Sequence, residues 1–385
     1  MKPSSVDSIS SIADELGIKR LLILAWRDLD DPESGGSEIH AHEIAKRLAE
    51  SGISVTLRTS TAFNHPKVKM RDGYRVVRKS GRYMVFLRSA LSLLFHFDGH
   101  YDAIVEVWNG MPFFTPILSS RRKVIIVHHV HAEMWQMTLS PVLAKIGNII
   151  EEKIAPIFYR KQLIVAPSPS SKSDIIKRLH FRDSNVVTVS PGVDAQFKPS
   201  VSKSKHPSLL VVGRLVPVKR HDVLIDAVKR IHEIVQDVEL NIVGDGYMKE
   251  SILDKITNLN ARSYIHVLGH IDEKQLINLY QKSWLLVSMS QREGWGLTIL
   301  EAGSCGTPCV VSNILGHQDA VVDKKTGFLA DDMDDFISKV TMLLQDSDLR
   351  GQMGNEAQIQ GSSLSWDNTA LELMKVLKRS KSRKV

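Results

Sequence analysis

Cysteine, aromatic residues and long apolar runs are all scarce in this sequence of 385 residues. Its two cysteines, Cys305 and Cys309, lie in an apolar stretch, so we interpret them as small core residues of a reduced protein, not as a disulfide or a metal pair. No run approaches the roughly 20 apolar residues that cross a bilayer. Residues 1–20 are polar and lack the apolar segment of a secretory signal. We therefore expect a cytoplasmic protein.

Aromatic residues form only 6% of the chain and do not alternate with its basic runs. This argues against stacking platforms for nucleic acid. The net charge of +7 arises in residues 1–200, where 27 Lys and Arg face 20 Asp and Glu, while the remainder balances at 23 of each. Basic surfaces attract nucleic acid or anionic lipid. A nucleic-acid-binding protein therefore stays an alternative from another functional class, although we expect no nucleic-acid partner.

Strand and helix patterns alternate along the chain, whose length suits two domains. The apolar runs that read as strands include residues 21–26, 53–59, 74–79, 102–107, 123–127, 209–212, 239–243 and 284–288. Residues 198–207 are polar, contain two prolines and make the best linker. We predict an α/β fold of two Rossmann-like, doubly wound parallel sheets, in domains 1–198 and 199–365, that face each other across a cleft.

Two glutamates eight positions apart, Glu293 and Glu301, stand out in the second half. The sequence between them gives a glycine-bearing turn after a buried strand, then a helix from Leu297. Such a turn and helix start can approach a phosphate closely. Two carboxylates, which only accept hydrogen bonds, can hold hydroxyls at both ends of an extended ligand such as a sugar nucleotide. Solvated glutamates beside an ordinary turn are the alternative.

Arg214 and Lys219 follow another buried strand of the second half, within one loop. Arginine can grip a phosphate with two hydrogen bonds, and lysine adds a mobile point charge. Together with the two glutamates they could bind a nucleoside diphosphate and stabilise it as a leaving group. Two ordinary surface cations are the alternative.

The first half offers a second glycine loop and a histidine cluster. Gly35 and Gly36 precede a helical pattern for which Ser37 is a plausible N-cap, so this loop also suits a phosphate. His128, His129 and His131 follow a buried strand, where open α/β sheets place ligand groups. One histidine acting on a substrate is favoured over a metal cluster, because no fourth ligand is readable nearby.

These motifs together resemble the GT-B glycosyltransferases of family 4, which are retaining enzymes. The resemblance covers most of the chain. In the second half it rests on Gly-Arg-Leu at 213–215 with Lys219, Gly-His-Ile at 269–271, Glu-Gly-Trp-Gly-Leu at 293–297 and the pair of glutamates. In the first half it rests on Trp-Arg-Asp at 26–28, Gly-Gly-Ser-Glu at 35–38, Glu-Val-Trp-Asn at 106–109 and Ser-Pro-Gly-Val-Asp at 190–194.

The resemblance implies a role for each matching position. The catalytic candidates are Glu293, which would contact the donor sugar, Arg214 and Lys219, which would bind the diphosphate, and His128. Glu301 would hold the ribose hydroxyls. The further donor-site positions are Gly35, Gly36, Gly269, His270, Ile271, Gly294, Trp295, Gly296, Leu297 and Thr298. Glu106, Asn109 and His131 are acceptor-side candidates. The C-terminal helix, residues 366–385, would pack back on the N-terminal domain.

The mechanism inferred from the resemblance is a front-face displacement without a metal or other cofactor. Asp28, Asp30 and Asp31 precede the glycine loop and do not form an Asp-x-Asp metal site in a suitable place. A double displacement would need a nucleophile, for which Glu106 and Glu133 remain open. The donor base, the hexose and the acceptor stay undetermined by the sequence.

Residues 83–97 read as an apolar helix with arginines and lysines between positions 71 and 88 around it. Such a helix can lie on an anionic membrane, which would suit a lipid-linked or glycan acceptor. A buried helix with a solvated basic rim is slightly favoured. A sugar-nucleotide epimerase of the same fold remains an alternative. A phosphorylase lacks an identifiable pyridoxal lysine, and an oxidoreductase lacks Gly-x-Gly-x-x-Gly.

Overall fold

The computed structural model describes residues 4–132, 134–200 and 202–380, and it divides the chain into two compact units. Unit 1 comprises residues 1–192 and 366–385, and unit 2 comprises residues 193–365. We predicted the boundary six residues later. The predicted linker 198–207 instead packs on unit 2, since the Lys198 carbonyl accepts from Gln281 and the Ser204 carbonyl accepts from Trp284.

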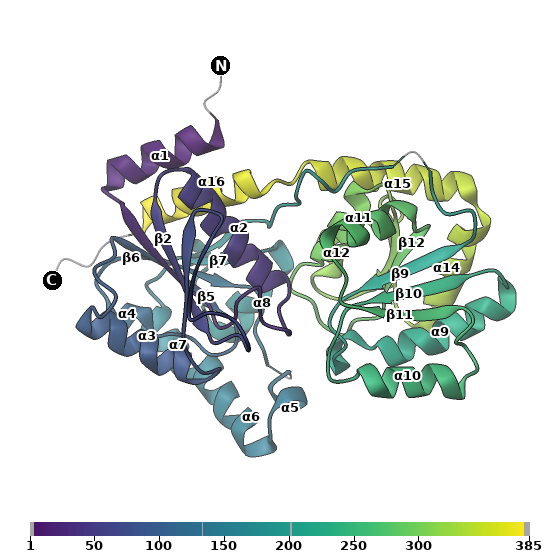
Figure 1. Cartoon of the computed structure of the whole chain (residues 1–385), viewed down its shortest axis with the longest axis horizontal. Helices are drawn as coiled ribbons and strands as arrows, with labels where there is room; N and C mark the ends of the chain where they lie inside the picture. Colours follow the sequence, from purple (N-terminus) through teal and green to yellow (C-terminus); the bar gives the residue numbers. More distant parts are fainter. Residues whose placement is uncertain (1–3, 133, 201, 381–385) are drawn as a thin grey trace. The chain divides into compact units, whose positions relative to one another are not determined.

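Unit 1 contains an eight-stranded sheet in the order β3-β4-β2-β1-β5-β6-β7-β8 (Figure 1). All neighbouring strands pair in parallel except β3 and β4. The strands are β1 (Arg20–Leu24), β2 (Ser54–Ser60), β3 (Val68–Arg71), β4 (Tyr74–Ser80), β5 (Ala103–Trp108), β6 (Arg122–Val127), β7 (Ile164–Ala166) and β8 (Val186–Thr188). The antiparallel strand β3 was not predicted, because its residues are mostly exposed and show no apolar run.

Helices cover both faces of this sheet, because successive side chains of β1 pack against helices on opposite faces. Leu21 and Ile23 pack with α1, α2 and α16, whereas Leu22 and Leu24 pack with α3. The helices of unit 1 are α1 (Ser5–Leu16), α2 (Gly36–Glu50), α3 (Met84–Phe95), α4 (Thr115–Leu118), α5 (Met134–Thr138), α6 (Pro141–Asn148), the π-helix η1 (Ile149–Ile154), α7 (Ala155–Tyr159), α8 (Pro169–Leu179), the 3-10 turn η2 (Asp183–Asn185) and α16 (Trp366–Arg379). The doubly wound architecture is confirmed.

The C-terminal helix α16 lies along α1 and α2 of unit 1 (Figure 1). Its Ala370, Leu373 and Leu377 are buried in the same core as the first strands. Helix α16 ends at Arg379 in the structure, and the basic residues at 381, 383 and 384 lie outside the described residues.

Unit 2 contains a wholly parallel sheet in the order β11-β10-β9-β12-β13-β14. Its strands are β9 (Ser208–Val212), β10 (Glu239–Val243), β11 (Ile265–Gly269), β12 (Leu285–Ser288), β13 (Cys309–Ser312) and β14 (Gly327–Ala330). Its helices are η3 (Pro217–Lys219), α9 (His221–Ile234), α10 (Lys249–Asn258), α11 (Glu273–Lys282), α12 (Leu297–Ser304), α13 (His317–Ala320), α14 (Met333–Gln345) and α15 (Ser347–Ser362). The sequence had suggested mostly loop where β14 and α13 lie.

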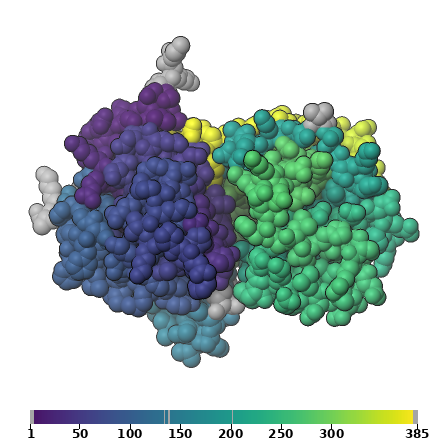
Figure 2. Space-filling model, viewed as in Figure 1, coloured from purple at the N-terminus to yellow at the C-terminus, as the bar shows by residue number. Residues whose placement is uncertain are grey.

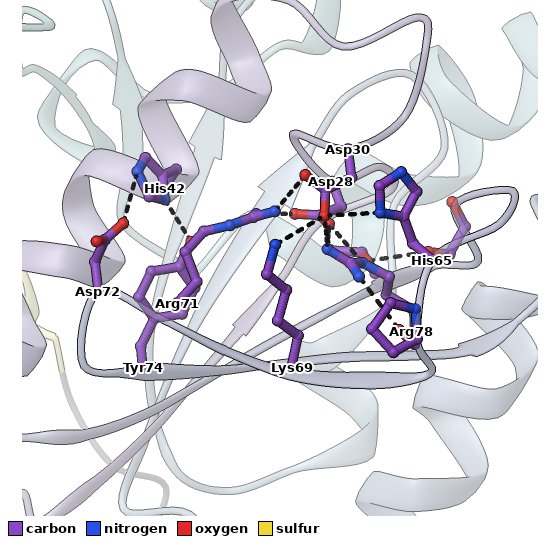
Figure 3. A network of polar contacts seen from close by, with 12 residues as sticks. Asp28, Asp30, His42, His65, Lys69, Arg71, Asp72, Tyr74 and Arg78 are labelled. Atoms are coloured by element: carbon purple, nitrogen blue, oxygen red, sulfur yellow. Dashed lines mark hydrogen bonds and ion pairs between the residues drawn. The ribbon is translucent and has the colours of Figure 1, made fainter.

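The arginines around residues 71–82 do not form a solvated basic rim. Arg78 is fully buried and donates to Asp28, 2.5 Å away, and Arg71 donates to the other Asp28 oxygen at 2.7 Å (Figure 3). Arg71 and Arg78 also pair with Asp30, whose pKa they hold below its ordinary value against the effect of burial.

Helix α3 itself exposes large apolar residues, so the buried-helix interpretation was wrong. None of the described helices is both long and apolar enough to cross a bilayer.

The buried charge network predicts unequal costs for removing its cations. Substitution Arg78→Met leaves Asp28 buried with one partner fewer, so we expect the free energy of unfolding of unit 1 to fall by about 3–5 kcal/mol. Substitution Lys69→Met is the matched control, because the Lys69 side chain is 42% exposed and its ammonium lies 3.6 Å from Asp30. For such an exposed pair we expect a loss of about 1 kcal/mol or less. Urea unfolding of both variants checks this, and equal losses would contradict it.

Candidate functional site

In each sheet the chain order reverses beside a central strand, and the predicted site residues follow the strands at that point. In unit 2 the chain runs from β9 outward to β11 and returns to β12 on the other side of β9. In unit 1 it runs from β1 to β2 and later returns to β5 on the other side of β1. Ligands of open α/β sheets bind outside the carboxyl ends of strands at such switch points. The loops after β9 and β12 carry Lys219 and Glu293, and those after β1 and β5 carry Gly35 and Asn109.

Lys219 and Glu293 form an ion pair at the switch point of unit 2. The Ser290 hydroxyl donates to the same Glu293 oxygen at 3.0 Å. Burial raises the pKa of Glu293, but Lys219, His317 and these hydrogen bonds outweigh it, so the pKa lies below its ordinary value. Both side chains keep under a fifth of their surface exposed. The structure therefore places an ionised carboxylate beside an ammonium group, both within reach of solvent.

The turn after Glu293 takes a conformation that depends on glycine. Gly296 has φ +81° and immediately precedes α12, whose first residues are Leu297 and Thr298. Gly316 has φ +89°, and a Cβ there would lie 2.5 Å from the Glu293 carbonyl oxygen. The indole N–H of Trp295 is buried and has no hydrogen-bond partner in the described parts of the chain. The first amides of α12 follow this turn directly, as in helix N-termini that bind phosphate.

Glu301 lies inside α12 and is only 8% exposed. The hydroxyl of Tyr280 on α11 donates to its Oε2 at 2.8 Å. Burial raises the pKa of Glu301 to about 7, although the Tyr280 hydrogen bond opposes this. Glu301 is therefore partly protonated at neutral pH. Tyr280 was missed in the sequence, because no local pattern links it to a residue 21 positions away.

The loop after β9 packs against the loop after β10 and fixes the position of Arg214. A Cβ on Gly244 would lie 2.0 Å from the Gly213 carbonyl oxygen, so this approach requires glycine. The imidazole of His221 lies 3.2 Å from the Arg214 carbonyl oxygen. The predicted base-binding segment begins with Gly269, the last residue of β11, at φ +70°, and continues with His270, which is exposed, and Ile271, which is partly buried.

In unit 1 the glycine loop is tied to α2 by Glu38. The amide of Gly35 donates to Glu38 Oε2 at 2.8 Å, and Gly35, not Ser37, is the N-cap. The Ser37 hydroxyl instead donates to Glu38 and accepts from the Asn109 amide at 3.2 Å. Gly36 is exposed, with open space where a Cβ would be. The structure therefore brings Gly35, Gly36 and Asn109 together.

His128 joins the same cluster through His40, a residue that the sequence analysis missed. His128 Nε2 and His40 Nδ1 are 2.8 Å apart, and both rings are buried. Burial lowers the pKa of His128 to about 4 and, with His128 nearby, lowers that of His40 well below its ordinary value. Both rings are therefore neutral at pH 7 and share one proton between these nitrogens. The Nδ1 of His128 is buried without a hydrogen-bond partner among the described residues.

Glu106 and His131, two of the acceptor-side candidates, differ in accessibility. Glu106 has no exposed surface and accepts from the Phe113 amide at 2.7 Å, from Thr115 and from the Tyr159 hydroxyl at 2.6 Å. This enclosure argues against contact with an acceptor and assigns Glu106 to holding the following loop. His131 is partly exposed and lies over Gly110, where a Cβ would be 3.0 Å from its ring. The other nucleophile candidate, Glu133, lies outside the described residues.

The described parts of the chain contain no group of three or more His, Cys, Asp or Glu residues placed to hold a metal ion. The histidines at 128, 129 and 131 do not converge on one point, because the His128 ring pairs with His40 while the other two rings stack on each other. The prediction of transfer without a metal is untested by this finding and remains a prediction.

Two family models together span most of the chain. Residues 34–197 match "Glycosyltransferase Family 4", and residues 193–360 match "Glycosyl transferases group 1". The chain therefore belongs to the family 4 (group 1) glycosyltransferases. The resemblance drawn from the sequence motifs is thereby confirmed, and the protein is an enzyme.

Curated relatives include D-inositol 3-phosphate glycosyltransferases from two species. The protein of Salinispora arenicola is 27% identical, over 89% of this chain and 87% of its own length. The protein of Thermobifida fusca is also 27% identical, over 89% and 88%. The identity is low enough that their substrates do not transfer to this chain without a test.

Solved structures of glycosyltransferases share the fold. Sucrose-phosphate synthase from Thermosynechococcus elongatus matches with a TM-score of 0.79 at 17% identity, over 94% of this chain and 98% of its own. WaaG, a glycosyltransferase involved in lipopolysaccharide biosynthesis, matches with a TM-score of 0.74 at 15% identity, over 93% and 99%. HepE from Anabaena, solved with UDP and glucose, gives 0.73 at 17% identity, over 94% and 100%. The GT-B fold is confirmed.

The raised pKa of Glu301 predicts a pH-dependent cost in stability. Between about pH 4.5 and pH 7 this carboxyl ionises in the unfolded chain but stays protonated when folded, so its destabilising effect grows as pH rises and levels off above pH 7. Glu301→Gln should therefore gain stability over wild type across this window, by up to about 3 kcal/mol. Urea unfolding at both ends of the window checks this. The exposed Glu250→Gln is the control, and a Glu301→Gln difference that is the same at both ends would count against it.

Proposed function

We propose that this glycosyltransferase moves a hexosyl group from a nucleoside diphosphate sugar to a hydroxyl of a glycan or lipid-linked acceptor, with retention and without a metal. The observation that carries the proposal is the Lys219–Glu293 ion pair at the switch point of unit 2. The pair offers one cation and one carboxylate side by side, which would suit a diphosphate followed by a hexose. The complexes of HepE with UDP and UDP-glucose, in a protein of the same fold, support a nucleotide-sugar donor.

The ion pair implies an exchange of partners when the donor binds. Without a ligand, Lys219 and Glu293 neutralise each other, so neither charge is left unpaired. A bound diphosphate would attract Lys219 away from Glu293. Lys219 and Arg214 would then together stabilise the negative charge of the leaving group. Glu293 would then accept hydrogen bonds from the hexose hydroxyls. Glu301, with Tyr280 on one oxygen, would accept from the ribose, and residues 269–271 would border the base.

The proposed chemistry is a front-face displacement. The bond between the anomeric carbon and the diphosphate oxygen breaks, the acceptor oxygen bonds the same face, and a leaving oxygen takes the acceptor's proton. Fixed cations would stabilise the departing diphosphate, which is the work a metal does in other transferases. Nuclear magnetic resonance of the product reports the anomeric configuration, and inversion would contradict retention. An epimerase would instead change the donor sugar without an acceptor.

Nucleotide binding tests the donor site. We expect one of UDP, GDP and ADP to raise the melting temperature of wild type with EDTA present, and Arg214→Ala to lose most of this shift. At about a hundred times Kd the stabilisation should reach about 3 kcal/mol. Glu293→Gln should keep or increase the shift, because it releases Lys219, yet lose transfer. No shift with any of the three nucleotides would overturn the proposed donor site, and a shift lost only with EDTA would overturn metal independence.

The pair of histidines in unit 1 predicts a positioning role for His40. In His40→Phe the Nε2 of His128 loses its partner, so kcat should fall about 10–100-fold, as it does when outer-shell partners of functional groups are removed. His40→Asn can restore a hydrogen bond and should recover part of the rate. The Kd of the nucleotide, whose proposed ligands lie mainly in unit 2, should stay unchanged in both variants. Equal rates for Phe, Asn and wild type would show that His128 needs no such support.

A further inference from the structure

Helix α3 exposes a row of large apolar side chains, although Val85, Phe86 and Leu93 pack inward. Its buried positions are Val85, Ser89 and Ser92, whereas Leu87, Leu91 and Leu94 are 38–52% exposed. These leucines follow the spacing of one helix face, and Tyr83, Met84 and Phe95 extend it. A helix that only served the core would not carry this second apolar row, because apolar surface left in water forgoes the stabilisation that burial gives.

The segment α6–η1–α7 likewise buries small residues and exposes large apolar ones. Its buried positions include Ala144, Gly147 and Ala155, while Ile146 and Ile157 are 48% and 60% exposed. Further exposed apolar residues run along the segment from residue 142 to residue 158.

The two segments belong to one surface of unit 1. Helix α4 packs against both α3 and α7, Ile117 of α4 is 54% exposed, and Phe114 lies against Phe158 with ring centroids 5.9 Å apart (Figure 1). In Figure 2 the teal segment that contains α6 projects from the lower side of this unit. We call the exposed side of residues 83–97, Ile117 and residues 142–158 the apolar face.

Cations accompany the apolar face, with few acids. Residues 83–97 carry Arg88 and no carboxylate. Between residues 141 and 161 the exposed cations are Lys145, Lys153, Arg160 and Lys161, and of the two glutamates there Glu151 is buried. Lys145 and Lys153 also line a hollow of about 500 Å³, where Glu152 is the one carboxylate among the lining residues described. An apolar stripe edged by lysine and arginine is the pattern of a surface that lies in the plane of an anionic bilayer.

We propose that the apolar face of unit 1 docks on an anionic lipid bilayer. The leucines and isoleucines enter the boundary between headgroups and acyl chains, and the lysines pair with lipid phosphates. The surface differs from the one suggested by the sequence, since Arg71 and Arg78 take no part and residues 142–161 supply most of the charge. The proposal does not depend on the proposed donor or reaction.

Vesicle flotation of the full chain tests the docking. We expect wild type to float with phosphatidylcholine vesicles that contain a quarter phosphatidylglycerol, and to float less with phosphatidylcholine alone or at high salt. Leu91→Glu with Ile157→Glu should leave the protein in the bottom fraction. Ile359→Glu is the matched control, because Ile359 is 65% exposed on α15 of unit 2 and should not affect flotation. Circular dichroism verifies that the variants fold.

Charge variants give a second, milder test. Lys153→Gln with Lys161→Gln should weaken partitioning by about fivefold per cation, and Lys274→Gln with Lys324→Gln, both exposed in unit 2, should not. Wild type that stays in the bottom fraction with anionic vesicles would overturn the proposal, as would flotation that Leu91→Glu with Ile157→Glu leaves intact. A wild-type dimer that this pair dissociates, without flotation, would assign the face to a second copy of the chain.

Discussion

Parallel pairing on both sides of β1 and of β9 is the constraint on which the site depends. Parallel strands end at the same edge of a sheet, so loops distant in the sequence meet wherever the chain order reverses. This brings Lys219, after β9, to Glu293, after β12, across 74 positions. It also brings Asn109, after β5, to Ser37, after β1. No local interaction would hold these residues together if the strand order were different.

Burial then decides the charge state of the groups that the strands bring together. Glu293 has Lys219 as a partner and its pKa falls, whereas burial raises the pKa of Glu301 to about 7 despite the hydrogen bond from the Tyr280 hydroxyl. His40 and His128, buried against each other, stay neutral. Asp28 is also buried, and it accepts hydrogen bonds from both Arg71 and Arg78. Two carboxylates of one motif thus differ in protonation because of residues outside the motif.

The apolar runs were sufficient to predict nearly all parallel strands, because such strands are buried on both faces. They also placed Lys219, Glu293, Asn109 and His128 at strand ends. The partners His40 and Tyr280 escaped prediction, since each contacts the site through the fold and neither carries a local signal. Strand β3 and strand β14 escaped it too: the first is exposed at the sheet edge, and the second is only four residues long.

Periodicity also fails to say which side of a helix is buried. The spacing of Leu87, Leu91 and Leu94 is what a core-facing stripe would show, yet the structure buries Ser89 and Ser92 instead. Val85, Phe86 and Leu93 also pack inward, so α3 is apolar on both sides while its buried positions include small residues. Helix α6 likewise buries Ala144 and Gly147. Two unrelated sequences that both pack small residues inward and expose large apolar ones give up folding free energy. That arrangement is physically reasonable when the exposed side is covered by something other than water.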